Sequence, residues 1–229
     1  METLRAPVPL YDYDYQSVLG GFTYERLQMA DFVLSLLINT AEFRNRAMSY
    51  RDFNVGAGAL AIRGNVSGRL LGFNVKHDET DTVNIHAEDL VTAKAQDAGF
   101  NEIAVMAVIG PTQEDHASGQ LMPTLHPCGR CRSRFKESPL ITDRTLFVTA
   151  RPDFTVIELG SLTDIENQHA GKPSELQTYH YDATPEVFSP LPEPDARGYR
   201  KAVEVDDADW MTSVGSYLSA RYFTNLTQS

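Results

Sequence analysis

The sequence predicts a three-layer α/β/α fold, in which helices cover both faces of a mixed central sheet of about five strands. Two observations carry this prediction. Short apolar runs rich in β-branched residues are bounded by turn signals, and between them lie segments whose apolar positions recur every three to four residues. In chain order these elements read strand, strand, helix, strand, helix, strand, which is typical of a sheet with helices packed on it. An irregular acidic extension follows.

The chain is long enough for one substantial core and an appended part. It has 229 residues, of which 42% are hydrophobic. We expect an N-terminal arm over residues 1–22, a main domain over 23–160 and a C-terminal extension over 161–229. The extension is expected to contain a proline-rich loop and a terminal helix.

The first regular elements are a helix and a hairpin. Thr23 can cap a helix that ends near Met48, and its apolar positions step by three and four residues: Leu27, Ala30, Leu34, Leu37 and Ala41. Two strand-like runs follow, over 55–62 and 69–75. Gly64 and Asn65 lie between them, which favours a hairpin turn.

The middle of the chain alternates helices and buried strands. After a polar loop, a helix begins at His86 and stops at Gly99. The run 103–109 is apolar and β-branched and predicts a buried strand. A polar loop over 111–125 leads to a second helix, which begins at Cys128 and ends near Glu137. Further strands are expected over 145–149 and 155–159.

The pattern weakens toward the C-terminus. Residues 164–200 contain five prolines and little periodicity, which leaves open a functional lid, an extended arm or a partly disordered segment. Asp207 can cap a terminal helix that reaches about Tyr222, with Trp210, Val214, Tyr217 and Leu218 on its apolar side.

Charge and hydropathy narrow the classes of partner. The formal net charge is −11, and residues 151–229 alone carry 6 Lys and Arg against 13 Asp and Glu. Such a surface repels polyanions, so we expect no nucleic-acid partner. The basic group Arg130, Arg132, Arg134 and Lys136 cannot share one helix face, which favours a solvated helix over a phosphate-binding stripe. No apolar run reaches the roughly 20 residues of a membrane span, and a secretion signal is not recognisable, so we expect a cytoplasmic protein without a membrane partner.

The most informative feature is a pair of short motifs with metal-binding spacing. His86-Ala87-Glu88 is followed by Pro127-Cys128-Gly129-Arg130-Cys131, and the latter holds both cysteines of the chain. His86, Cys128 and Cys131 supply three ligands and leave a fourth tetrahedral position open, as in a catalytic zinc site. Glu88 lies off the ligand face, where it can work in a pocket. A disulfide between the cysteines is the alternative, but an oxidising compartment is not indicated.

This order of ligands and carboxylate is the signature of zinc-dependent nucleobase deaminases. In that chemistry zinc lowers the pKa of water toward neutrality. Glu88 is expected to take the proton, protonate the ring nitrogen and later deliver a proton to the departing amine. The predicted reaction is hydrolysis of the C–N bond of a cyclic amidine, with release of ammonia.

The stretch from about Tyr50 to Ala150 resembles the cytidine deaminase family beyond the zinc motif. Residues 50–57, Tyr-Arg-Asp-Phe-Asn-Val-Gly-Ala, resemble a family segment whose Phe packs on the nucleoside, here Phe53. Residues 71–75, Leu-Gly-Phe-Asn-Val, resemble the strand end whose Asn binds a ribose hydroxyl, here Asn74. Residues 128–132 are similar to the Cys-Gly-x-Cys-Arg run of free-nucleoside deaminases.

The resemblance implies a cytidine-deaminase-like fold, a Zn²⁺ cofactor and a small nucleoside substrate. By this resemblance zinc would bind to His86, Cys128 and Cys131, Glu88 would be the catalytic residue, and a homodimer or homotetramer is expected. The expected substrate contacts are Phe53, Asn74, Lys76, Ala87 and Pro127, and the backbone of Ala87 would face the pyrimidine.

The chain departs from the family at Lys76, where relatives carry a ribose-binding Glu. A cation there favours an anionic or differently substituted sugar, and the string Asn74-Val75-Lys76-His77 is closer to that of blasticidin S deaminase. The leading hypothesis is hydrolytic deamination of cytidine, deoxycytidine or a modified cytosine nucleoside to the uridine form. The alternatives are a blasticidin-S-type or biosynthetic deaminase of a modified nucleoside or nucleotide, a nucleic-acid-editing deaminase, and a catalytically retired zinc-binding interaction module.

Overall fold

A mixed six-stranded sheet forms the centre of the protein. The computed structural model describes residues 26–49, 51–64, 66–77, 84–114, 119, 121–189, 193–194 and 208–222. The predicted arm over 1–22 and the predicted caps Thr23 and Asp207 lie outside these residues. The strands, in spatial order, are β3 (Val66–Phe73), β2 (Gly56–Arg63), β5 (Glu102–Ile109), β6 (Leu146–Ala150), β7 (Val156–Gly160) and β8 (Gln177–His180). Strands β5 and β6 are parallel, and the other neighbours are antiparallel.

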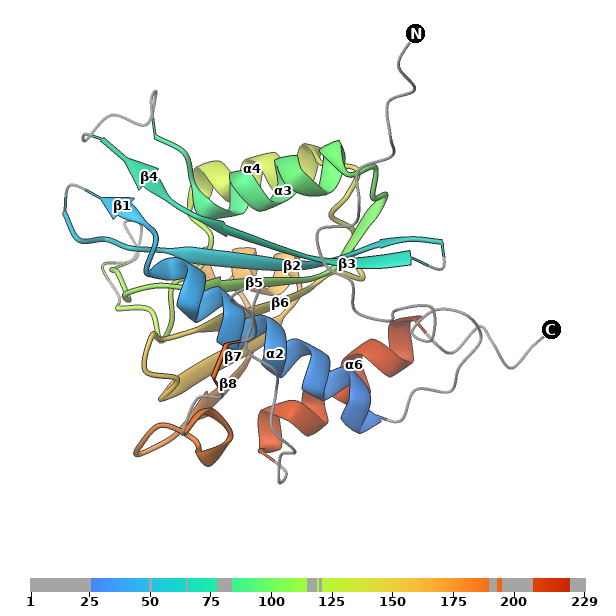
Figure 1. Ribbon diagram of the computed structural model, residues 1–229. Coiled ribbons are helices and arrows are strands. Elements are labelled where there is room, and N and C mark those ends of the chain that lie inside the picture. Colours follow the sequence, from blue (N-terminus) through green and yellow to red (C-terminus); the bar gives the residue numbers. More distant parts are fainter. Residues whose placement is uncertain are drawn as a thin grey trace, which may run out of the picture.

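Helices cover both faces of the sheet, which confirms the predicted three-layer α/β/α class. Figure 1 shows α3 (Ala87–Asp97) and α4 (Gly129–Glu137) on one face and α2 (Arg26–Arg44) and α6 (Asp209–Tyr222) on the other. One buried apolar cluster lies between the sheet and α2 and α6, and a second lies beneath α3 and α4. Among the described helices, none is both long enough and apolar enough to span a bilayer.

The hairpin predicted at Gly64 is present, and the second of its predicted strands is interrupted. Strands β2 and β3 pair from Gly56 with Phe73 to Arg63 with Val66. The expected run over 69–75 breaks at Asn74, after which β4 (Val75–Lys76) pairs in parallel with β1 (Met48–Ser49). At the interruption the Asn74 side chain bonds to the backbone of residues 53 and 55, while its own backbone donates to Val55 O and accepts from Met48 N.

Helix α2 packs closely on the sheet because strand β2 carries glycine where the helix approaches. A Cβ atom on Gly58 would lie 2.2 Å from Thr40 Oγ1 and 2.9 Å from the Leu36 side chain. The buried face of α2 is wide, since adjacent positions are also buried: Ala30, Val33, Leu34, Leu36, Leu37 and Ile38. The helix ends at Arg44, earlier than the expected Met48, because Met48 belongs to the β1–β4 pair.

The described part of residues 161–229 contains the predicted terminal helix, α6, and short elements that the sequence did not predict. Helix α5 (Leu162–His169) begins at a capping box, in which the Ser161 hydroxyl accepts from Asp164 N and the Asp164 carboxylate accepts from Ser161 N. Strand β8 extends the sheet beyond β7. Elements this short show too few repeats for their periodicity to be recognised in the sequence.

The far end of the chain is attached to the core through aromatic side chains. Phe188, in the short helix η1 (Glu186–Phe188), stacks on Phe154 with ring centroids 3.7 Å apart, and Trp210 of α6 lies 6.1 Å from Phe188. Trp210 is fully buried. Helix α6 therefore covers the sheet face beside α2 as part of the fold.

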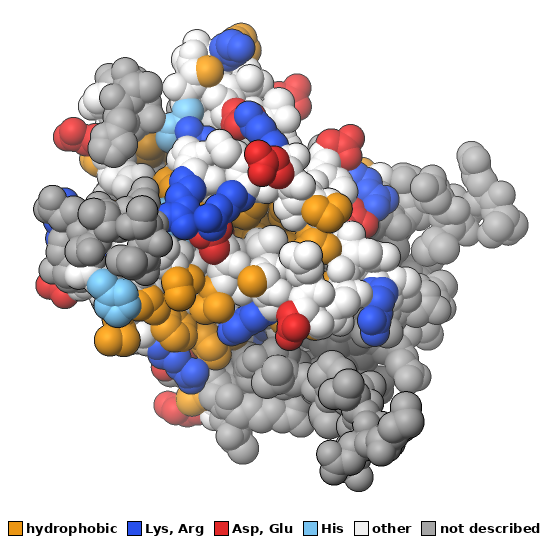
Figure 2. Space-filling view, turned by 90° about the horizontal axis from the view of Figure 1, so that it is seen from above, with side chains coloured by type: hydrophobic (Ala, Val, Ile, Leu, Met, Phe, Trp, Pro, Cys, Tyr) orange, Lys and Arg blue, Asp and Glu red, His pale blue; other side chains and the backbone are white. Residues whose placement is uncertain are grey.

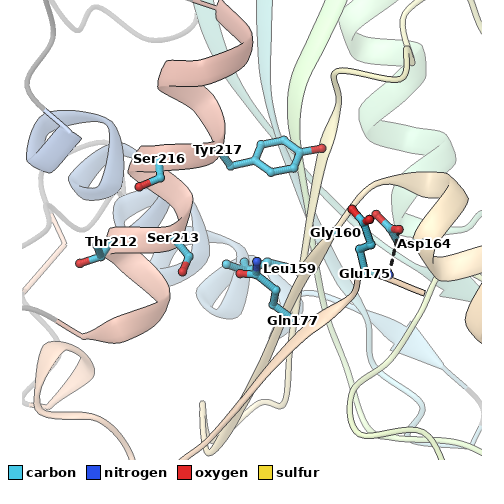
Figure 3. Close-up of a pocket in the computed structure, with 9 residues that line it drawn as sticks. All are labelled: Leu159, Gly160, Asp164, Glu175, Gln177, Thr212, Ser213, Ser216 and Tyr217. Carbon is cyan, nitrogen blue, oxygen red and sulfur yellow. Dashed lines mark hydrogen bonds between the residues drawn. The ribbon is translucent and has the colours of Figure 1, made fainter. Parts of the chain in front are cut away.

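A polar cavity of about 390 Å³ lies between α6 and the strands β7 and β8 (Figure 3). Its lining combines carboxylates, hydroxyls and one aromatic ring: Leu159, Gly160, Asp164, Glu175, Gln177, Thr212, Ser213, Ser216 and Tyr217. Asp164 is already engaged there, since its carboxylate accepts from Glu175 N and from the Ser161 hydroxyl.

Candidate metal centre

Two helix N-termini bring the predicted ligands together. His86 is the residue before α3, with extended backbone angles, and Cys128 has the same place before α4. Cys131 lies in the first turn of α4. Gly72 lets the start of α3 approach strand β3, because a Cβ atom there would lie 2.8 Å from the carbonyl oxygen of Ala87. The positive ends of both helix dipoles therefore point at the same place, where they stabilise thiolates.

The three side chains form a compact donor set. His86 Nδ1 lies 3.5 Å from Cys128 Sγ and 3.2 Å from Cys131 Sγ, and the three ligand atoms all lie within 4.8 Å of one another. His86 and Cys131 are buried, and Cys128 is partly exposed. One imidazole and two sulfurs at such distances fit Zn²⁺, which binds nitrogen at about 2.0 Å and sulfur at about 2.3 Å. Within the described residues, this is the one cluster of His, Cys, Asp and Glu that could hold a metal ion.

The two thiols differ in acidity when no metal neutralises them. A hydrogen bond from Cys131 lowers the pKa of Cys128 to about 3, and His86 contributes to the shift. The same hydrogen bond, which Cys131 donates to Cys128, raises the pKa of Cys131, and burial adds to the increase. Cys128 also raises the pKa of His86. The metal-free site thus carries one thiolate and one thiol, so binding a metal through both sulfurs requires the loss of a proton.

Glu88 lies in the same pocket but outside the donor set. It occupies the first turn of α3 and is 5% exposed. Burial raises the pKa of its carboxyl, since the charged form is poorly solvated there. A carboxyl group with a raised pKa can both accept and return protons near neutral pH, which is what a general acid–base requires.

The pocket beside the donor set has a buried end and a partly exposed end. The buried members are Val55, Asn74, His86, Ala87, Glu88, Leu125 and His126, and the partly exposed members are Phe53, Lys76, Gln113 and Cys128. Four of the five expected substrate contacts, Phe53, Asn74, Lys76 and Ala87, line this pocket. Pro127 does not line it, and its carbonyl oxygen accepts a hydrogen bond from Arg132 at 2.8 Å.

Asn74 and Lys76 both contact Phe53. Asn74 is buried, its Oδ1 accepts from Val55 N at 2.7 Å, and its Nδ2 donates to the carbonyl oxygen of Phe53 at 2.8 Å. The amide therefore holds the segment that carries Phe53. The Lys76 ammonium lies 5.1 Å from the centre of the Phe53 ring, within the range of a cation–π contact.

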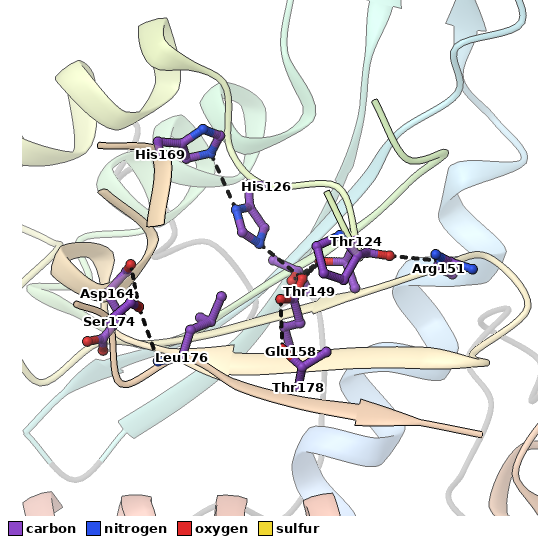
Figure 4. Close-up of polar contacts among 11 residues, drawn as sticks. Thr124, His126, Thr149, Arg151, Glu158, Asp164, His169, Ser174, Leu176 and Thr178 are labelled. Atoms are coloured by element: carbon purple, nitrogen blue, oxygen red, sulfur yellow. Dashed lines mark hydrogen bonds and ion pairs between the residues drawn. The ribbon is translucent and has the colours of Figure 1, made fainter. Parts of the chain in front are cut away.

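A buried polar network, which the sequence did not reveal, lies against the pocket (Figure 4). Glu158, on strand β7, accepts hydrogen bonds from His126 Nε2 at 3.0 Å, from Thr124 at 2.5 Å and from Thr178 at 3.1 Å. Burial alone would raise the pKa of Glu158, but the bonds from His126 and the threonines outweigh it and hold the pKa below its usual value. Glu158 is therefore an ionised acceptor, and its three partners donate to it.

His126 links this network to the loop that supplies Cys128. It lies in a loop, yet it is only 2% exposed. Its Nδ1 lies 3.3 Å from His169 Nε2 on α5. The available signal was the carboxylate of Glu158 within the apolar run Val156–Leu159, because a charge in a buried strand requires partners.

The basic group on α4 is paired with nearby acceptors. Arg130 and Arg134 both contact the Asp89 carboxylate, and Lys136 Nζ lies 2.6 Å from Glu166 Oε1. Figure 2 views the molecule from the side of α3 and α4, where basic and acidic side chains are interspersed. The four basic residues therefore do not form a continuous stripe of unpaired positive charge.

Comparison with known proteins gives matches among solved structures alone. No protein-family model matches the chain, and no curated protein does. The chain is similar to cytidine deaminase from Burkholderia pseudomallei, with 25% identity, 57% of this chain and 92% of that chain covered, and a TM-score of 0.45. It is also similar to the cytidine deaminases from Mycobacterium tuberculosis (24% identity, 48% and 77% covered, TM-score 0.35) and Mycobacterium leprae (16%, 55% and 89%, TM-score 0.38). Because these TM-scores are below 0.5, the similarity does not assign a function to this chain. Its function has to be inferred from its own residues.

Proposed function

We propose that this protein is a zinc-dependent hydrolase that deaminates a free cytosine nucleoside to the uridine form and releases ammonia. The observation that carries the proposal is the convergence of His86, Cys128 and Cys131 within 4.8 Å beside the buried carboxyl of Glu88. The order of these residues in the chain is the signature of nucleobase deaminases. A structural zinc site would instead close all four positions with protein ligands.

The residues of the pocket have separate roles in this proposal. His86, Cys128 and Cys131 would hold zinc, which lowers the pKa of water toward neutrality. Glu88 would accept one proton of the attacking water and transfer it to the ring nitrogen next to the amine-bearing carbon. It would then carry the second proton of that water to the departing amine. The ring of Phe53 provides an apolar surface for the base. The helix dipole at the start of α3 favours negative charge where the reaction develops it.

A free nucleoside fits the chain better than a nucleic-acid strand. The net charge of −11 opposes the approach of a polyanion. Three of the four basic residues of α4, Arg130, Arg134 and Lys136, are paired with Asp89 or Glu166. The fourth, Arg132, donates to the carbonyl oxygen of Pro127. A single-stranded oligonucleotide should therefore not be deaminated.

The test is ammonia release from the zinc-loaded protein. We expect release from cytosine nucleosides and none from adenosine or a single-stranded oligonucleotide. Glu88→Gln should lower kcat by at least about 10³-fold, because the proton shuttle is lost, while it should keep bound zinc. Glu137→Gln, at an exposed carboxyl on α4, is the matched control and should retain activity. Equal activity of the Glu88 variant, or a chain that binds no zinc, would refute the proposal.

Self-association belongs to the same proposal. The described surface exposes three large apolar side chains, Met48, Ile85 and Leu121, and Ile85 immediately precedes His86. Apolar side chains beside a site favour a contact between subunits. We propose a homodimer or homotetramer, and light scattering on the zinc-loaded protein tests it; a monomer at all concentrations would exclude it.

A further inference from the structure

The partly exposed end of the pocket carries a cation that the deamination chemistry does not use. Lys76 belongs to strand β4 and is partly buried, and its ammonium lies over the ring of Phe53. The structure records no ion pair between Lys76 and any described residue. Its charge also reaches the metal centre, where it acts to lower the pKa of His86 against the larger opposing effect of Cys128. Lys76 is therefore close to the site, yet no described carboxylate compensates it.

The other charges of the pocket do not neutralise Lys76. Within the described lining, Glu88 is the one carboxyl group, and it lies at the buried end with a raised pKa. Two thiolates would balance the charge of a bound Zn²⁺, so the metal centre adds little net charge. The nearby carboxylate of Asp89 is occupied by Arg130 and Arg134.

The shape of the pocket decides which part of a substrate meets this cation. The base must lie beside Glu88 and the donor set, because the reacting carbon has to approach both. The sugar then extends toward solvent, where the partly exposed lining residues other than Cys128 are Phe53, Lys76 and Gln113. A substituent that carries negative charge would find an ammonium that is held in place by its contact with an aromatic ring.

We infer that Lys76 is a specificity-determining residue and that the preferred substrate is a cytosine nucleoside with an anionic group, a phosphate or a carboxylate, on its sugar. The inference rests on the proposed deamination. Because the chain as a whole carries a net charge of −11, its long-range field repels such a substrate. A preference for an anionic substrate therefore requires a cation inside the pocket. At close range the Lys76 ammonium outweighs the field of the distant charges, because salt screens that field.

The experiment compares kcat/KM for cytidine with kcat/KM for cytidine 5′-monophosphate, cytidine 3′-monophosphate and cytidine-5′-carboxylate. We expect at least one anionic substrate to exceed cytidine by about 10- to 100-fold, the range of a hydrogen-bonded charge pair. The phosphate and carboxylate arms show which group is recognised. Lys76→Met should abolish the preference without lowering turnover of cytidine to the same extent, and Lys76→Arg should restore most of it.

Lys172→Met is the matched control, because it removes one positive charge from an exposed turn outside the pocket. It should leave the preference unchanged. Turnover of cytidine at the same efficiency as every anionic substrate, or a preference that Lys76→Met leaves intact, would overturn the inference while leaving the deamination in place. Inactivity on every substrate would instead count against the proposed function.

Binding of the products gives a readout that does not depend on turnover. Calorimetry should show that the wild-type protein binds at least one of uridine 5′-monophosphate, uridine 3′-monophosphate and uridine-5′-carboxylate about 10-fold more tightly than uridine. Lys76→Met should bind all four alike. Equal binding of all four by the wild-type protein would overturn the inference even if no substrate were turned over.

Discussion

Individual side chains in the metal centre differ in protonation although they are chemically alike. Cys128 and Cys131 are both thiols at the start of α4, yet the pKa of Cys128 is lowered to about 3 and that of Cys131 is raised. The cause is their proximity, since two negative charges at this distance repel and only one forms without a metal. The environment likewise separates two carboxyl groups: burial raises the pKa of Glu88, while hydrogen bonds from three donors hold the pKa of Glu158 below its usual value.

At the scale of the residue, we predict that zinc affinity increases with pH. Zinc binds thiolates, so binding expels the proton of Cys131, and a lower proton concentration favours the complex. One displaced proton corresponds to about a tenfold gain in affinity per pH unit near neutrality. Competition with a chromophoric chelator over about two pH units measures this slope. Cys131→Ala, with one ligand fewer, should bind zinc much more weakly and lose most of the slope, and a flat profile for the wild type would contradict the prediction.

At the scale of the element, the Glu158 network joins strand β7 to the loop before α4. Thr124 and His126 come from that loop, Thr178 comes from β8, and the carboxylate binds all three. Thr149 on β6 lies 2.5 Å from Thr124 as well. A single buried charge therefore connects three strands to the segment that presents Cys128. Such outer partners commonly set the position of a metal ligand.

We predict that Glu158→Gln destabilises the fold by about 3 kcal/mol at neutral pH, because buried donors lose their charged acceptor. The pKa of Glu158 is depressed in the folded state, so its stabilisation is present above the unfolded pKa of about 4.3 and is lost as pH falls through the folded pKa. Urea unfolding of both proteins, stripped of zinc, should therefore show a difference that shrinks in acid. Glu137→Gln serves as the exposed control, and a difference that persists unchanged in acid would contradict the prediction.

At the scale of the whole molecule, helix α6 is part of the core. Helix α6 packs against α2, and Trp210 extends the stack formed by Phe154 and Phe188. This places α6 on the sheet face opposite the metal centre (Figure 1). None of the described residues of α6 lines the pocket beside the donor set.

We predict that Trp210→Ala lowers the free energy of unfolding by about 3–5 kcal/mol, the cost of removing a large buried aromatic side chain. Urea denaturation followed by circular dichroism measures the change. Thr212→Ala, at an exposed position of the same helix, should cost less than about 1 kcal/mol. If Trp210→Ala were equally mild, α6 would be an appendage, as a separate extension over 161–229 would require.

Patterns along the sequence are sufficient to predict much of the fold and the residues of the metal centre. The hairpin at Gly64, the strands β5 to β7, the helices that begin after His86 and Cys128, and the α/β class all follow from short-range periodicity and turn chemistry. The donor set follows too, because the spacing of His86, Cys128 and Cys131 reflects the geometry of one metal ion and two helix starts. These features depend on neighbours in sequence, so one chain is enough to recognise them.

The tertiary structure alone decided the contacts between distant segments. The sequence does not predict that Glu158 bonds to His126 or that the Lys76 ammonium lies over Phe53. It also does not predict that the Asn74 side-chain amide bonds to the backbone of residues 53 and 55. It also leaves α5 and β8 unrecognised, since short elements are stabilised mainly by what they pack against. The physical reason is the same in each case: burial, hydrogen-bond partners and local charge depend on which segments meet in space, and no pattern along the chain records that.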